Sequence, residues 1–131
     1  MPQAMATEIE KQCEIIEECY EFTLSFAARG LASDEGTELR EFLKRAAAAM
    51  RGLEPSCADL MASARLAPIE KYKAYFAVLL RDAEGAIAAV DLVLAQPTIG
   101  SQLIDNLNAS MHLRALLADL FLVTEILKAS H

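Results

Sequence analysis

A group of glutamates near the start of the chain carries the side chains best suited to chemistry. At about 100° per residue on a helix, five of them fall within roughly 100° of arc, opposite an apolar face. Lys11 is the one basic residue among them, and like charges one turn apart repel by roughly a few tenths of a kcal/mol per pair. A cation or a basic partner would relieve that repulsion. These candidate interaction residues are Glu10, Glu14, Glu17, Glu18 and Glu21.

Part of this group has the form E-E-x-x-E, and carboxylates one helical turn apart can ligate Mg²⁺ or Mn²⁺. Downstream, Glu38-Leu39-Arg40-Glu41 opens the next predicted helix. Together these stretches resemble the all-α nucleotide pyrophosphohydrolases of the MazG type, in which E-E-x-x-E and, on the next helix, E-x-x-D hold Mg²⁺ against a nucleoside triphosphate. The likeness covers about residues 16 to 43, and the second stretch offers E-x-x-E in place of E-x-x-D. The resemblance implies a Mg²⁺ or Mn²⁺ site formed by Glu17, Glu18, Glu21 and Glu38.

Other catalytic patterns find little support in the sequence. His112 is the one internal histidine, and there is no C-x-x-C, no G-x-S-x-G and no phosphate-binding glycine loop. Cys13, Cys19 and Cys57 read as reduced residues in or beside a core. We therefore expect no cofactor apart from the alternative metal, and the sequence favours a non-enzymatic role without deciding the matter.

Apolar residues at helical spacing predict the elements that position these side chains, and no strand-like alternation occurs. A capping box of Thr7 and Glu10 opens the first helix, Ser33 or Asp34 can cap the second, and Pro68 opens the fourth. The helices are expected at about residues 7–29, 34–52, 56–66, 68–96 and 101–128. The predicted fold is all-α: an antiparallel four-helix bundle with one additional short helix between the second and third long helices, in a single domain 1–131.

The predicted helices 68–96 and 101–128 carry more apolar surface than a monomeric bundle needs. Glycine inside a helix costs about 1 kcal/mol against alanine, so Gly85 suggests close approach by another backbone. We predict a homodimer through these two helices, with the short helix 56–66 as an alternative cover for part of the surface. The candidate contact residues are Ala74, Gly85, Ala88, Leu92, Ile104, Met111, Leu122 and Ile126.

Charge narrows the choice of partner. A net charge of −7 argues against nucleic acid and anionic membranes, and no apolar run is long enough to span a bilayer. A cytoplasmic location is therefore predicted. On the neighbouring helix, Arg40, Lys44 and Arg51 could pair with the glutamates.

These features predict a small acidic helical bundle that acts through protein–protein interaction with a partner that carries basic residues. An adaptor, an assembly factor or a chaperone-like protein would fit, and self-association is expected. The alternative is a divalent-metal-dependent nucleotide pyrophosphohydrolase-like protein that uses the first-helix glutamates. A small-molecule pocket between the helices, for instance near Tyr72 and Tyr75, stays open as a third possibility.

Overall fold

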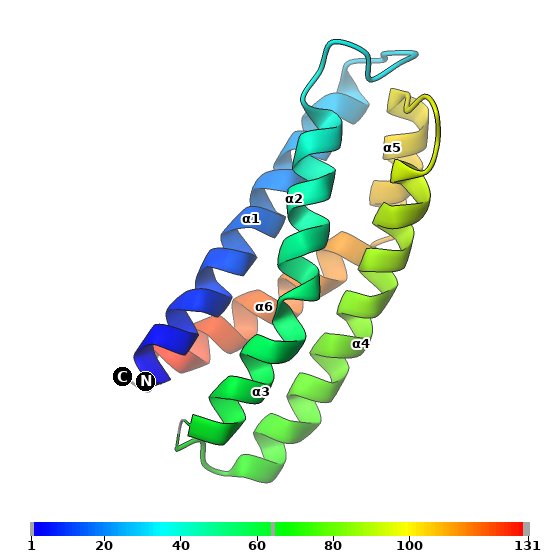
Figure 1. Cartoon of the computed structure of the whole chain (residues 1–131). Helices are drawn as coiled ribbons and strands as arrows, with labels where there is room; N and C mark the ends of the chain where they lie inside the picture. The colour runs from blue at the N-terminus through cyan, green and yellow to red at the C-terminus, as the bar shows by residue number, and fades with distance from the viewer. Residues whose placement is uncertain (1, 64, 130–131) are drawn as a thin grey trace.

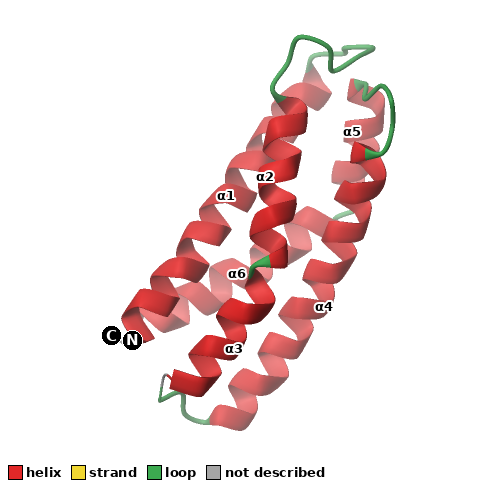
Figure 2. Ribbon diagram, viewed as in Figure 1, coloured by secondary structure: helices red, strands yellow, loops and turns green. Residues whose placement is uncertain are grey.

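The chain is almost entirely helical. A computed structural model describes residues 2–63 and 65–129, with their side chains from residue 8 onward. Within these ranges there is no strand, and loops join the helices (Figure 2). The helical segments are α1 (Pro2–Ala28), α2 (Leu39–Arg51), α3 (Leu53–Ser63), α4 (Ile69–Leu94), α5 (Ser101–Ala109) and α6 (His112–Ala129).

These segments pack as the four antiparallel members of a helical bundle, which confirms the predicted fold. The first member is α1, the second is α2 with α3, the third is α4 and the fourth is α5 with α6 (Figure 1). The start of α1 and the end of α6 lie at the same end of the bundle (Figure 1). Both α1 and α4 pack against α2, α3, α5 and α6, so they are the central members of the packing.

The short additional helix is present, but it continues α2 as one bent helix. Gly52 joins the two segments, and its N–H still bonds to the carbonyls of Ala48 and Ala49. Pro55 has no N–H to offer the carbonyl of Arg51, which favours a bend at this point. Gly52 also makes room for α1, because a Cβ there would lie 2.6 Å from Nε2 of Gln12. The predicted span 56–66 is therefore wrong, and the segment covers 53–63.

Two helix starts also differ from the prediction. Helix α1 begins at Pro2, so Thr7 lies inside the helix and the predicted capping box at its start is wrong. Helix α2 begins at Leu39 instead of residue 34, because Asp34 uses its side chain on Arg40 and on the N–H of Ile99 and caps no helix. Helix α4 covers 69–94, close to the predicted 68–96.

The predicted helix 101–128 is interrupted at Met111, and this break redirects the chain. Met111 has φ 69°, the left-handed conformation that ends α5. Ser110 supports the turn, because its hydroxyl donates to the carbonyl of Leu107 at 2.6 Å. The carbonyl of Met111 then accepts the first hydrogen bond of α6, from Ala115 N–H at 2.8 Å. As a result α6 leaves α5 at an angle and crosses behind the bundle (Figure 1).

The left-handed backbone at Met111 yields a stability prediction. For a residue with a Cβ this conformation costs roughly 1–2 kcal/mol, and glycine escapes that cost but has a more flexible unfolded chain. Met111→Gly should therefore raise the free energy of unfolding by about 0.5–1 kcal/mol in urea denaturation. Ser110→Gly is the matched control, because φ is −68° at Ser110 and glycine there should destabilise. Destabilisation by Met111→Gly would contradict the prediction.

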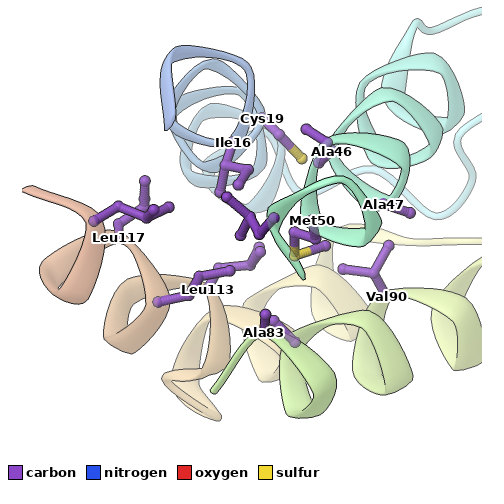
Figure 3. Close-up of a cluster of buried hydrophobic side chains, with 14 of the residues drawn as sticks. Ile16, Cys19, Ala46, Ala47, Met50, Ala83, Val90, Leu113 and Leu117 are labelled. Carbon is purple, nitrogen blue, oxygen red and sulfur yellow. The ribbon is translucent and has the colours of Figure 1, made fainter. Parts of the chain in front are cut away.

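One continuous apolar core runs through all six segments. In its centre, Ile16 and Cys19 of α1 face α2, where the thiol of Cys19 lies beside Ala46 (Figure 3). Met50 of α2, Val90 of α4 and Leu113 of α6 complete this layer of the core. Leucine, isoleucine, valine and alanine supply most of its side chains, as the composition leads one to expect. This packing fixes the mutual orientation of α1 and α6, which form the site described below.

Arg40 and Ser101 hold two loops together at the end of the bundle where α1 and α4 finish. The guanidinium of Arg40 donates to Asp34 at 2.7 Å and to the carbonyls of Leu94 and Gln96 at 3.0 and 2.8 Å. Ser101, which is buried, donates to the carbonyl of Phe26 and accepts the N–H of Leu31. The 29–38 loop is thereby tied to the 95–100 loop.

Candidate functional site

Four of the five predicted interaction glutamates lie near bases or near a groove that the sequence did not reveal. Glu18 lies 3.8 Å from Arg45 of α2, and Glu10 lies 3.7 Å from Lys128 of α6. These two bases, distant in sequence, partly neutralise the row that seemed to have Lys11 alone. Glu14, Glu17 and Glu21 have no ion pair within the described residues, so they remain available to a partner.

Two of the three bases that were expected to pair with these glutamates pair with other carboxylates. Arg40 pairs with Asp34, and Arg51 pairs with Asp91 of α4. Lys44 has no ion pair within the described part of the chain. The pairing proposed for Arg40 and Arg51 from the sequence is therefore wrong, and Arg45 takes that place.

The metal ligands suggested by the family resemblance are not brought together. In the described ranges no group of three or more histidine, cysteine or acidic side chains could hold a metal ion. Glu18 and Glu21 are exposed on α1, and Glu38 is exposed just before the first residue of α2. Carboxylates that hold Mg²⁺ must converge on one point, which Glu17, Glu18, Glu21 and Glu38 do not.

A groove between α1 and α6 is the most distinctive surface feature beside the glutamates. It has a volume of about 460 Å³. Its apolar lining includes Leu24 of α1 and Phe121 of α6, which are 47% and 45% exposed, although large apolar side chains are usually buried. The remaining lining residues are Glu17, Tyr20, Glu21, Arg114, Leu117 and Ala118.

Charges border this apolar groove on both walls. Glu17 and Glu21 belong to the α1 wall, and Arg114 belongs to the α6 wall. None of these three side chains forms an ion pair within the described residues. The groove can therefore accept an apolar group along its floor and a basic group against α1.

The residues that line this groove are regularly spaced in the sequence, but only the structure shows that the two sets lie side by side. Glu17, Glu21 and Leu24 follow one another at intervals of four and three residues, and so do Arg114, Ala118 and Phe121. Each set lies along one line of its helix, at the edge of the core face. Leu24, Arg114 and Phe121 were missed, because no local pattern shows that the two lines meet.

The surface predicted to contact a second copy is largely exposed, with two corrections. Leu92, Met111, Leu122 and Ile126 are exposed, as are Ala74 and Ala88. Ile104 is fully buried in the core of the chain itself, so it cannot belong to this surface. Gly85 accommodates a side chain of its own chain instead of another backbone, because a Cβ there would lie 3.2 Å from Nδ1 of His112.

The pocket suspected near the start of α4 is a shallow apolar hollow. Its volume is about 270 Å³, and Lys71, Tyr72 and Tyr75 of α4 line it with Val123 and Ile126 of α6. The hydroxyl of Tyr75 is already engaged, donating to the carbonyl of Asp119 at 3.0 Å. The hollow therefore offers few polar groups that could orient a small ligand.

The three cysteines are core residues. All are buried and free, and burial raises the pKa of Cys13 to about 11, of Cys19 to about 12 and of Cys57 to about 11. The neighbouring Glu17 and Glu14 raise the pKa of Cys13 further. Since the thiolate is the nucleophile, these thiols are unreactive near neutral pH.

Comparisons with protein-family models, curated proteins and solved structures found no match to this chain. Within the described residues, no helix combines the length and apolar character that crossing a membrane requires.

Proposed function

We propose that this protein acts by binding another protein, and that the groove between α1 and α6 receives a basic amphipathic helix of that partner. The observation that carries the proposal is the pair of exposed apolar side chains, Leu24 and Phe121, beside Glu17 and Glu21. These two carboxylates form no ion pair with any described residue. An amphipathic helix presents an apolar line and a charged flank, which are the two features this groove complements.

Overall charge supports a basic partner. The net charge of −7 draws a basic segment toward the protein, and Glu17 and Glu21 place negative charge beside the groove. Arg114 on the opposite wall would pair with an acidic residue on the other flank of the bound helix. Adaptor, assembly-factor and chaperone-like roles all use a surface of this kind.

The test uses a synthetic helical peptide with leucine and phenylalanine at i, i+3, i+4 and i+7 and lysine along one flank. Glu17→Lys together with Glu21→Lys should weaken its binding about tenfold or more, because each reversal replaces attraction by repulsion. The measurement is fluorescence anisotropy of the labelled peptide at low and physiological salt, since screening weakens exposed charge pairs.

A charge-matched control distinguishes the effect of the groove glutamates on peptide binding from the effect of the protein's net charge. Glu35→Lys together with Glu41→Lys changes the net charge by the same amount at exposed positions outside the groove. This variant should bind the peptide within about threefold of the wild type. Equal weakening by both variants would mean that net charge alone attracts the peptide, and unchanged binding by the groove variant would reject the site.

A crosslinking experiment carries the test to the natural partner. A photoreactive amino acid at Leu24 should attach to a segment with the pattern of a basic amphipathic helix, whereas the same group at Ala88 on the outer side of α4 should not. Attachment at Leu24 to segments without that pattern would contradict the proposed partner chemistry.

Self-association is a second candidate, favoured by a different surface. Leu92 is 67% exposed, and Met111, Leu122 and Ile126 add exposed apolar area on α6 and just before it. Where such side chains form one contiguous apolar patch, the patch marks a contact surface. Light scattering at micromolar concentration tests it directly: a mass near 14.3 kDa would reject the dimer, and twice that mass would support it.

A further inference from the structure

The outer face of α4 carries exposed apolar side chains along most of its length. Leu92 is 67% exposed, more than any other large apolar side chain of the described residues, and Val78 is 43% exposed. Ala74 and Ala88 are exposed beside them. Positions 74, 78, 81, 88 and 92 repeat at intervals of three, four and seven residues, so they form one line along the helix. This is the spacing with which one helix packs along another.

Two opposite charges lie at the middle of this face. Arg81 belongs to the line itself, and Glu84 lies beside it, three residues further along α4. Both side chains are exposed, and neither forms an ion pair within the described part of the chain. The outer face of α4 therefore offers one base and one acid to a partner that carries the complementary pair.

We propose that the outer faces of α4 from two copies of the chain pack antiparallel, about a two-fold axis at the level of residue 83. The proposal rests on self-association, the second candidate function above, and assigns its contact surface. About this axis Val78 lies opposite Ala88 of the second copy, and Leu92 lies opposite Ala74. A two-fold contact repeats each pair in reverse, so every large side chain of the line meets a small one.

Charge favours the same arrangement. About the axis at residue 83, Arg81 of each copy comes beside Glu84 of the other, which gives two contacts between opposite charges. A parallel pair of helices would instead place every residue opposite itself, with Arg81 against Arg81 and Leu92 against Leu92. The like charges would then repel each other across the interface, so the antiparallel pairing is selected.

The apolar hollow between α4 and α6 adds a place for the most exposed side chain. Lys71 and Tyr75 border this hollow, and they lie three residues before Ala74 and one residue after it. Leu92 of the second copy, opposite Ala74, would contact the edge of the hollow. A contact made mainly by one pair of helices is smaller than the roughly 1,200 Å² of a stable interface, so we expect a dissociation constant in the micromolar range.

Sedimentation across micromolar concentrations tests the charges. Arg81→Glu and Glu84→Arg should each weaken the dimer about tenfold or more, because each places like charges across the axis. The variant with both changes restores opposite charges and should dimerise within about threefold of the wild type. Lys44→Glu is the matched control, because it reverses an exposed base on α2, away from this face, and should leave the dissociation constant within the same range.

A pair of cysteines tests the register. In a variant with both Val78→Cys and Ala88→Cys, the new thiols of two copies lie opposite each other, and mild oxidation should give a covalent dimer on a non-reducing gel. Each single variant should give little of it, because its two new thiols lie about 15 Å apart along the helices. A disulfide needs Cα atoms within about 7 Å. The three native cysteines are buried.

The outcomes separate this arrangement from self-association in general. A mass near 14.3 kDa at every concentration would reject the dimer and this proposal with it. A dimer that ignores both charge reversals, or that gives no covalent product in the double-cysteine variant, would retain self-association and overturn the assignment to α4. Failure of the double charge variant to recover would also overturn the proposed pairing of Arg81 with Glu84.

Discussion

Replacing Arg40 with alanine should lower the free energy of unfolding by about 2–4 kcal/mol at pH 7. The guanidinium donates to Asp34 and to the carbonyls of Leu94, Gln96 and Pro97. Its removal leaves a carboxylate that is 12% exposed without its cation, together with carbonyls at the end of α4 that lose their donor. Chemical denaturation of the variant at constant pH measures the loss.

An exposed arginine provides the matched control. Arg45 pairs with Glu18 at 3.8 Å, and their side chains are 55% and 58% exposed, so Arg45→Ala should cost less than about 1 kcal/mol. Equal losses in the two variants would show that Arg40 contributes no more than a surface ion pair. Arg40→Lys should recover only part of the loss, because an ammonium cannot reproduce the planar set of donors.

Low pH should reduce the difference in the free energy of unfolding between the wild type and Arg40→Ala. Partial burial acts to raise the pKa of Asp34, but the N–H of Ile99 and the guanidinium of Arg40 outweigh it, and the pKa is lowered overall. A carboxyl with a lowered pKa stabilises the fold above its unfolded value of about 3.9, and this contribution is lost as the pH falls through the folded value. The cost of Arg40→Ala should therefore be largest at neutral pH and shrink below about pH 4.

The sequence predicted the bundle well where helix ends carry strong local signals. Pro68 and Pro97 bracket α4, and its span was predicted to within about two residues. The break at Met111 could not be foreseen, because serine and methionine are no helix breakers and the left-handed residue is not a glycine. The late start of α2 could not be predicted either, because the carboxylate of Asp34 accepts a hydrogen bond from the N–H of Ile99, 65 residues away, instead of capping the helix.

One wall of the candidate groove between α1 and α6 could be predicted from the sequence, and the other could not. Helical spacing located Glu17 and Glu21 on the outer side of α1, and this determines one wall of the groove. The other wall comes from α6, and its direction follows from the turn at Met111, which has no local signal. The partners of Glu10 and Glu18 were missed because Lys128 and Arg45 reach them through tertiary packing.

Phe76→Ala should produce the largest loss of stability, about 3–5 kcal/mol. Phe76 is 2% exposed on α4 and packs beside Tyr72, with ring centroids 6.2 Å apart. Truncation removes a buried aromatic side chain and leaves a cavity that its rigid helical neighbours cannot fill. Urea denaturation measures the effect, and a loss below about 1 kcal/mol would mean that the helices collapse around the site.

Phe121→Ala makes the same substitution as Phe76→Ala, but at an exposed position in the groove instead of in the core. Phe121 is 45% exposed, so little burial is lost, and stability should fall by less than about 1 kcal/mol. Binding of the basic helical peptide should nevertheless weaken severalfold, because the groove loses its largest exposed apolar side chain. Normal peptide binding by a stable Phe121→Ala variant would show that the exposed ring serves no partner. Lost binding with retained stability would place this phenylalanine at the interface.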